Sequence, residues 1–333
     1  MYSIDELAKY ISLEDIPYSW INCYEYIKKQ YNCRWLDNYD FNLILSYYEF
    51  NNDFKERFYK ELRILKQDNK LNVICFIMYY ILFVADMKNY YNIWSWKSTN
   101  NVFKNNGSYM IPVVALLCGH KFHIENMKTR NFDLEQIKLQ KYNIKLTCTN
   151  DNIKYGINGI RFSQMIWGSY FMKGYLIQIG RLQYEVGVKN FNKLDKYFEE
   201  KHQYIYIHIP RDTHLNEKDV NESFSLADKY IKKYYPELKN EKLAYYTKTW
   251  LLSPEVKEIL STNSNILKFQ NKFNIIEYEE NVNDFLNFVF DKVLGEVNYN
   301  DLPEKTTLQS ELKKRLLNGD KLHLGLGFLD VSK

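Results

Sequence analysis

Three hydrogen-bonding side chains alternate along an apolar segment in the second half of the chain. Arg181, Gln183 and Glu185 are spaced two residues apart within residues 175–186, and most of the intervening positions are apolar. Side chains two apart in a β-strand lie on the same face, so this spacing predicts a strand with one polar face. That face is either a cleft wall in which Glu185 is a general base, or a solvent-facing surface with an arginine–glutamate pair.

A second predicted strand, residues 204–209, leads through a proline into a tight connection and a helix that begins at Asn216. A helix start presents unpaired N–H groups and the positive end of the helix dipole to anions. We therefore expect Arg211, Asp212, Thr213 and Asn216 to bind phosphate groups, with the Arg211 guanidinium binding in a bidentate manner. The alternative for Arg211 is an ion pair with Asp212 or Asp219.

His208 lies near the end of this second strand, between two isoleucines. An imidazole is the commonest general base in enzymes, and His208 is our other candidate for that role. A buried histidine with a purely structural hydrogen bond is the competing interpretation.

The remaining histidines and cysteines do not indicate a metal site. His120 and His123 are three residues apart, and we interpret them as positive charge at the C-terminal end of a helix. The five cysteines are unclustered, which is typical of free thiols in a reducing cytoplasm. No phosphate-binding P-loop or dinucleotide fingerprint occurs in a suitable context.

The chain divides into two parts of different architecture, and the candidate residues lie in the second part. The first ~140 residues read as helices, with a capping box at Ser3 and Glu6, a long candidate helix over 41–65 and a buried helix over 73–85. Turn-forming residues over 143–160 predict a boundary, which divides the chain into domains 1–145 and 146–333. In the second domain Ser253 followed by Pro254 predicts a helix N-terminus, and another short helix is predicted after Ser264. The order of elements there is β-β-α-β-α-β-α-α-β. The fold class is therefore α/β, or α+β, with a helical first domain.

Composition excludes several classes of function. The chain has 333 residues and a formal net charge of +4, so it lacks the concentrated basic surface that nucleic-acid binding requires. The longest apolar run, over 73–85, is too short to span a bilayer, and the first residues do not resemble a signal peptide. We expect a cytoplasmic protein with no nucleic-acid or membrane partner.

From about residue 175 to 328 the chain resembles a bacterial family of acyltransferase-domain proteins with a helical N-terminal domain and a GNAT-like (N-acetyltransferase-like) C-terminal domain. The resemblance rests on Ile207-His208-Ile209-Pro210 and on the stretches 179–185, 222–223, 249–254, 264–270, 288–290 and 301–303, taken in order. It implies a mixed-sheet GNAT fold and acyl transfer from acetyl-CoA or another acyl-CoA to an amine of a small molecule or peptide, without a metal.

In GNAT enzymes generally the pyrophosphate of coenzyme A binds between the fourth strand and the next helix, and residues 204–216 are similar in order. Arg181, Gln183 and Trp250, which all lie in matched stretches, are expected to line the substrate cleft. The usual glycine pattern of the phosphate loop is replaced here by residues 211–216. A GNAT-like module that binds a peptide or protein partner without catalysis is therefore the alternative.

Overall fold

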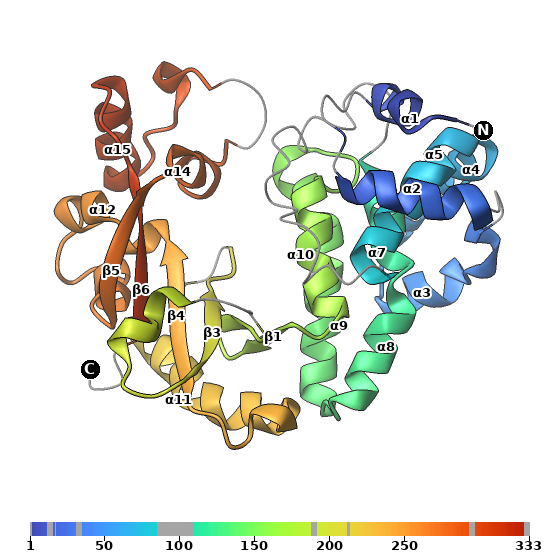
Figure 1. Ribbon diagram of the computed structural model, residues 1–333. Helices are drawn as coiled ribbons and strands as arrows, with labels where there is room; N and C mark the ends of the chain where they lie inside the picture. Colours follow the sequence, from blue (N-terminus) through green and yellow to red (C-terminus); the bar gives the residue numbers. More distant parts are fainter. Residues whose placement is uncertain are drawn as a thin grey trace. The chain divides into compact units, whose positions relative to one another are not determined.

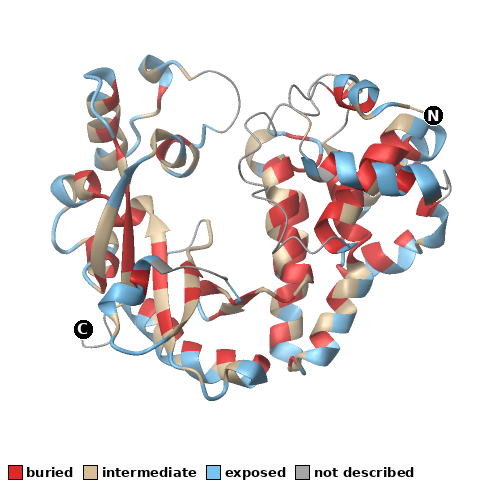
Figure 2. Cartoon of the chain, viewed as in Figure 1, coloured by how far each residue is buried: buried red, intermediate tan, exposed pale blue. Residues whose placement is uncertain are grey.

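The computed structural model describes residues 2–11, 16, 18–30, 35–84, 109–187, 192–211, 214–292 and 297–329 (Figure 1). They divide into two compact units, Met1–Tyr175 and Leu176–Lys333. Each unit buries a hydrophobic core of its own (Figure 2).

The N-terminal unit is built from helices in its described residues. The predicted helix start at Ser3 is confirmed, since the Ser3 hydroxyl accepts a hydrogen bond from the Glu6 amide at 3.0 Å, which is one half of a capping box. The apolar run from residue 73 is confirmed as a core helix over its described part, which stops at Val84. The elements are α1 (Ile4–Tyr10), α2 (Tyr18–Gln30), η1 (Trp35–Asn38), α3 (Phe41–Tyr47), α4 (Asn52–Gln67), α5 (Asn69–Tyr79), η2 (Tyr80–Val84), α7 (Met110–Leu117), α8 (His120–Thr129), α9 (Leu134–Tyr155) and α10 (Phe162–Met172).

The single helix predicted over residues 41–65 is two helices, α3 and α4. Glu49 between them has a φ of 57°, in the left-handed region, which turns the chain out of the helix. Asn51 then caps α4, because its side-chain oxygen Oδ1 accepts a hydrogen bond from the backbone amide of Phe54 at 2.9 Å. Tyr48 and Phe50 are both buried, so the apolar pattern continues across the break and conceals it.

The turn-forming residues around position 145 are helical in the structure. The division predicted between residues 145 and 146 lies inside α9. The boundary between the two compact units lies between residues 175 and 176 of the sequence. The Thr147 and Thr149 hydroxyls donate to carbonyl groups four residues earlier, at 2.8 and 3.0 Å, so these side chains fit within a helix. The helix ends at Gly156, whose φ is 65°.

The C-terminal unit is an α+β domain around a six-stranded mixed sheet, which confirms the predicted fold class. The strand order is β1-β2-β3-β4-β6-β5, and β3 and β4 are parallel while the other neighbours are antiparallel. The strands are β1 (Leu176–Ile179), β2 (Leu182–Glu185), β3 (Gln203–His208), β4 (Leu243–Thr249), β5 (Phe273–Glu280) and β6 (His323–Leu329). The helices are η4 (Asn192–Tyr197), α11 (Glu217–Tyr234), η5 (Pro236–Leu238), η6 (Trp250–Leu252), α12 (Pro254–Ile259), α13 (Asn265–Gln270), α14 (Val282–Phe288), η7 (Tyr299–Asp301) and α15 (Thr307–Leu317).

The predicted strand over residues 175–186 is a hairpin. Ile179 pairs with Leu182, which leaves Gly180 and Arg181 as a two-residue turn between β1 and β2. Gly180 has a φ of 59°, the positive value that such tight hairpin turns require. Arg181 is therefore in a turn, and Gln183 is the residue that shares a strand face with Glu185.

The two faces of the sheet differ in what covers them. Helix α11 packs on one face, where the buried Ser223 hydroxyl accepts the amide of Leu182 at 3.3 Å and contacts the Tyr184 hydroxyl at 3.1 Å. The cross-strand pairs place Glu185, Tyr206, His208, Tyr246 and Lys248 together on the opposite face, which we call the front face.

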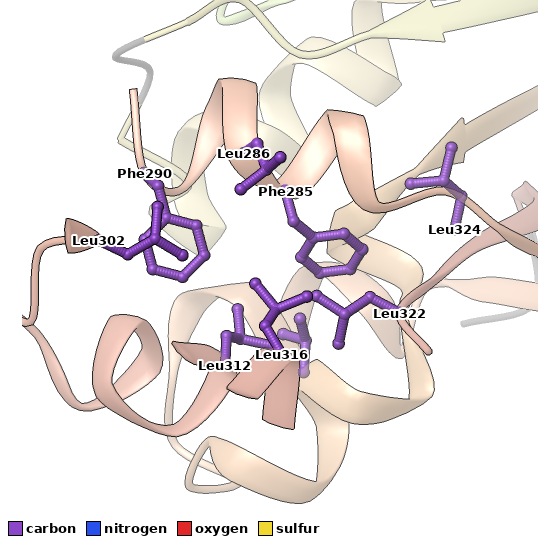
Figure 3. Packing of buried hydrophobic residues seen from close by; sticks show 9 residues of the cluster. Phe285, Leu286, Phe290, Leu302, Leu312, Leu316, Leu322 and Leu324 are labelled. Carbon is purple, nitrogen blue, oxygen red and sulfur yellow. The ribbon is translucent and has the colours of Figure 1, made fainter. Parts of the chain in front are cut away.

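A long segment, residues 281–322, separates the neighbouring antiparallel strands β5 and β6, and we call it the β5–β6 insertion. Helices α14 and α15 belong to it and lie beyond the end of the sheet toward which β4 points (Figure 1). It packs against the sheet end through its own apolar cluster, which Figure 3 shows. The cluster consists of Val256, Phe285, Leu286, Phe290, Leu302, Leu312, Leu316, Leu322 and Leu324.

Candidate functional site

Two residues that the sequence singled out separately, Glu185 and His208, are in direct contact on the front face. Glu185 ends β2 and His208 ends β3, and the adjacent antiparallel strands bring the carboxylate to 2.8 Å from the imidazole Nε2 atom. The side chains are 21% and 18% exposed, so both are sheltered but accessible. A carboxylate in this position orients the ring and stabilises the imidazolium that forms when the ring accepts a proton.

Tyr206 lies beside this pair and joins it to β4. Its ring centroid is 4.2 Å from that of His208, and it stacks on Tyr246 at 4.8 Å with an interplanar angle of 5°. Its hydroxyl donates to the carbonyl oxygen of Lys248 at 3.0 Å. Burial is the main cause of the raised pKa of Tyr206, and the charges of Glu185 and Asp284 raise this pKa further.

The parallel strands β3 and β4 part next to these residues. Their pairing runs from Gln203–Leu243 to Tyr206–Tyr246. Beyond that point Ile207 and His208 pair with β2, whereas residues 247–249 pair with β6. The Glu185–His208 pair therefore lies where two parallel strands separate, at their C-terminal ends. Ligands of α/β sheets commonly bind at the carboxyl ends of parallel strands.

The three residues predicted to line a cleft occupy different environments. Gln183 is 5% exposed and lies opposite His208 in the ladder. Trp250 follows β4 in η6 and packs against the cluster of the β5–β6 insertion, with its ring 6.3 Å from that of Phe285. Arg181, in the hairpin turn, donates from Nε to Asp219 at 3.0 Å.

Arg211, a predicted phosphate ligand, binds the C-terminal end of α14. Its Nη2 atom donates to the carbonyl oxygen of Asn287 at 2.5 Å and also to the carboxylate of Asp291. Its guanidinium carbon lies 5.6 Å from the ring centroid of Phe288. The Arg211 side chain is 16% exposed and that of Asp291 is 61% exposed. Asp212 and Thr213 lie outside the described residues.

Asn216 is the N-cap of α11, as the sequence predicted for the start of this helix. Its side chain accepts the Asp219 amide at 2.9 Å and donates to the Asp219 carboxylate at 2.7 Å. Hydrogen bonds from Asn216 and Arg181 lower the pKa of Asp219. The negative charge of Asp219 therefore already occupies part of the anion-attracting end of α11.

A second carboxylate–histidine pair, Glu255 with His323, could not be predicted from the sequence. A Glu255 oxygen lies 2.7 Å from His323 Nδ1, and the other Glu255 oxygen accepts the Ser253 hydroxyl at 2.5 Å. Glu255 is near the start of α12 and His323 begins β6, so only the tertiary fold joins them. The sequence signal at Ser253 was a helix cap, and this cap is confirmed.

His120 and His123 are at the start of α8, and the prediction that they lie at a helix C-terminus is wrong. Gly119 separates α7 from α8, which places both histidines in the first turn of the second helix. Burial is the main cause that lowers the pKa of His123, to about 3.

Within the described part of the chain, histidine, cysteine, aspartate and glutamate nowhere gather in a group of three or more that could hold a metal ion. None of its helices is both long enough and apolar enough to cross a bilayer.

Comparison with known proteins gives a family match and several similar structures. A protein-family model described as a GNAT-like C-terminal domain matches residues 176–329. An acyltransferase in complex with decanoyl-CoA is similar, with a TM-score of 0.68, 19% identity and 86% of each chain covered. An acyltransferase in complex with decanoyl-CoA and teicoplanin has a TM-score of 0.64, 17% identity and the same coverage. A mutant acyltransferase in complex with octanoyl-CoA has a TM-score of 0.67, 16% identity and 87% coverage of each chain.

A comparison with curated proteins gives no match. The family match covers the whole sheet of the C-terminal unit, from β1 to β6, and the similar structures share the fold of most of the chain. Residues 176–329, which are most of the C-terminal unit, are therefore similar to the GNAT-like C-terminal domain family.

Proposed function

We propose that this protein is an acyl-CoA-dependent N-acyltransferase that transfers an acyl group from a coenzyme A thioester to a primary amine. The observation that carries the proposal is the Glu185–His208 contact, at 2.8 Å, beside the point where β3 and β4 part. The proposal is supported by the GNAT-like family match and by the similarity to acyltransferase structures that contain decanoyl-CoA or octanoyl-CoA.

In this proposal His208 acts as the general base and Glu185 orients it. The imidazole accepts a proton from the attacking amine, and the adjacent carboxylate stabilises the resulting positive charge. The amine nitrogen bonds to the thioester carbonyl carbon, the carbon–sulfur bond breaks, and coenzyme A leaves as the thiol after its sulfur takes up a proton. The partial shelter of the pair strengthens these electrostatic effects relative to bulk water.

The phosphate groups of the donor are assigned, within this proposal, to Arg211, Asp212, Thr213 and Asn216. Arg211 is held by the exposed Asp291 carboxylate, and a phosphate group can take the place of this carboxylate as a bidentate partner of the same guanidinium. Donor binding would then replace Asp291 while the bond to the Asn287 carbonyl remains.

Calorimetric titration with acetyl-CoA and decanoyl-CoA tests this assignment. Arg211→Ala should weaken binding by about tenfold or more, because a charge-assisted contact is lost. Asp291→Asn should strengthen it, because the competing carboxylate is removed. Unchanged affinity in both variants would contradict the assignment.

The catalytic assignment is tested by the rate at which the full chain releases thiol from decanoyl-CoA in the presence of a primary amine. His208→Asn should lower kcat by roughly 10²–10⁴-fold, the usual range for removing a general base. The matched control is His202→Asn, since His202 precedes β3 and its ring contacts the Glu200 carbonyl at 2.7 Å. Equal rates for the two variants would contradict a catalytic role for His208.

The alternative is a GNAT-like module that binds a peptide or protein partner without catalysis. It is favoured by the internal pairing of Arg211 with Asp291 and by the capped start of α11. Absence of any heat of binding with acyl-CoA, together with a copurifying protein, would support it over the enzyme.

We also propose a cytoplasmic location and no nucleic-acid or membrane partner. The support is that Cys23, Cys75, Cys118 and Cys148 are free and buried thiols, as in a reducing compartment. A small-molecule or peptide amine is the proposed acceptor, and one similar structure contains teicoplanin.

A further inference from the structure

An open cavity lies along helix α4, and the proposed function does not use it. Its volume is about 700 Å³, within the usual size range of ligand pockets. The described residues that line it all belong to α4, and they are Asn52, Lys55, Glu56, Arg57, Tyr59, Lys60 and Arg63. All of these except Arg57 follow one another at intervals of three or four residues, so they share one side of the helix. We call these six residues the α4 face.

The α4 face is held in place by the packing of its helix. On the opposite side of α4, Phe54, Phe58 and Leu65 are at most 2% exposed, which anchors the helix in the core of the N-terminal unit. On the face itself, the Tyr59 hydroxyl donates to the side chain of Asn42 in α3. The cavity therefore lies on an element that packing has already fixed, as a preformed ligand site requires.

Positive charge predominates in this cavity. Four of the described lining residues are cationic and Glu56 is the only acidic one among them, so their net charge is +3. The whole chain has a formal net charge of only +4. A concentration of charge of this sign attracts anions.

Three of the four cations have no partner within the part of the chain that the structure describes. The side chains of Lys55, Lys60 and Arg63 form neither an ion pair nor a hydrogen bond with any of these residues. Arg57, by contrast, is paired with Asp53 at 3.0 Å. The three unpaired cations are therefore available to an external anion.

The spacing of the three cations indicates what kind of anion fits. Lys60 and Arg63 are three residues apart, so both can contact one group. Lys55 lies eight residues before Arg63, about 12 Å along the helix axis, which a single phosphate group cannot span. Phosphate groups carry up to about two negative charges each at neutral pH, and they are strong partners for guanidinium and ammonium groups.

We propose that the α4 face binds a small polyanion in which two or more phosphate groups are linked. Lys60 and Arg63 bind one phosphate group, Lys55 binds another, and Glu56 limits the affinity by repulsion. This site is independent of the proposed acyltransferase chemistry, whose donor phosphates are assigned to the loop of Arg211 in the C-terminal unit.

Calorimetric titration of the full chain with tripolyphosphate at low ionic strength tests this proposal. Lys60→Gln and Arg63→Gln should each weaken binding by roughly two- to fivefold, as expected for exposed charge pairs, and the double variant by roughly tenfold. Glu56→Gln should strengthen binding, because the repelling carboxylate is removed. Added salt should weaken binding, since it screens exposed charges.

Lys128→Gln is the matched control, because Lys128 is an exposed lysine of α8 outside the cavity and its loss changes the net charge by the same amount. It should leave tripolyphosphate binding unchanged. An equal loss in this control would overturn the proposal, since that loss reports the net charge of the protein and not a site. Absence of any heat of binding with tripolyphosphate would overturn it as well.

Two further titrations identify the anion. Citrate, which carries three carboxylates, should bind more weakly than tripolyphosphate, and equal affinity would overturn the assignment to phosphate groups. Decanoyl-CoA should bind wild type and the Lys60→Gln, Arg63→Gln double variant with equal affinity. If the double variant lost affinity for decanoyl-CoA as well, the α4 face would belong to donor binding and a separate site would be refuted.

Discussion

The imidazole of His208 is held in place by the groups around it. Glu185 fixes the ring at 2.8 Å, and the Tyr206 ring covers it at 4.2 Å. Alternation along two strands predicted each residue as a candidate, but their contact depends on which strands are neighbours and in which register. The sequence contains no local signal for that register. The sequence could therefore nominate Glu185 and His208 as candidates, and it could not predict their contact.

Asp151 and Arg161 form a buried ion pair in the N-terminal unit, with side chains 0% and 4% exposed. The Arg161 Nε and Nη2 atoms donate to the two carboxylate oxygens at 2.9 Å each. Arg161→Met should destabilise this unit by about 3–5 kcal/mol, because it leaves a buried carboxylate unpaired. Urea denaturation of wild type and variant measures this loss as the difference between their free energies of unfolding.

Lys28→Ala is the matched control for the buried pair, because Lys28 and its partner Glu25 are 51% and 59% exposed. We expect a loss below about 1 kcal/mol for this exposed pair. A similar loss in both variants would contradict the role assigned to the buried one.

At the scale of elements, the β1–β2 turn depends on Gly180. Its φ is 59°, and a Cβ atom there would lie 3.2 Å from the Cβ of Ser223 in α11. Gly180→Ala should destabilise the C-terminal unit by more than the ~1–2 kcal/mol that a left-handed alanine costs. Chemical denaturation gives this free energy directly.

Gly319 provides the comparison, since its φ is 81° and a Cβ atom would meet nothing within 4 Å. Gly319→Ala should show the conformational cost alone. If both substitutions cost the same free energy, the close approach of α11 to the hairpin turn has no energetic weight.

The free energy of unfolding should depend on pH through Glu255, which joins α12 to β6 by its contact with His323. Burial alone would raise its pKa, but hydrogen bonds from Ser253 and His323 outweigh this effect, and the pKa is lowered from 4.5. A carboxyl group with a lowered pKa stabilises the folded state above its ordinary pKa, and this contribution disappears as the pH falls through the lowered value. Wild type should thus exceed Glu255→Gln in stability at pH 7, and the difference should shrink below about pH 4.5. A difference that stays constant from pH 7 to pH 3 would contradict this linkage.

Helix starts could be predicted from the sequence where a capping residue and the hydrophobic periodicity agreed. The starts of α11, α12 and α13 follow Asn216, Ser253 and Ser264, each of which accepts a backbone amide in the structure. It failed where a turn interrupts continuous apolar spacing, as at Glu49 and Gly180. A single residue in the left-handed region changes the path of the chain without altering the hydrophobic pattern.

At the scale of the whole molecule, the C-terminal unit has its own complete sheet and core. The six strands, α11 and the cluster of the β5–β6 insertion all lie within residues 176–333. We expect residues 176–333, produced without the N-terminal unit, to fold and to unfold cooperatively on heating. Circular dichroism and calorimetry would measure this, and a non-cooperative, coil-like fragment would contradict it.

The β5–β6 insertion has a consequence for how such a domain can diversify. The ladder between β5 and β6 is continuous from Phe273–Leu329 to Glu280–His323, apart from one bulge, so the two strands fix each other's register whatever joins them. The entropy of closing a connection rises only with the logarithm of its length, by about 0.6 kcal/mol per doubling. Related chains can therefore exchange this segment for shorter or longer versions at small thermodynamic cost while the pairing of β5 with β6 stays unchanged.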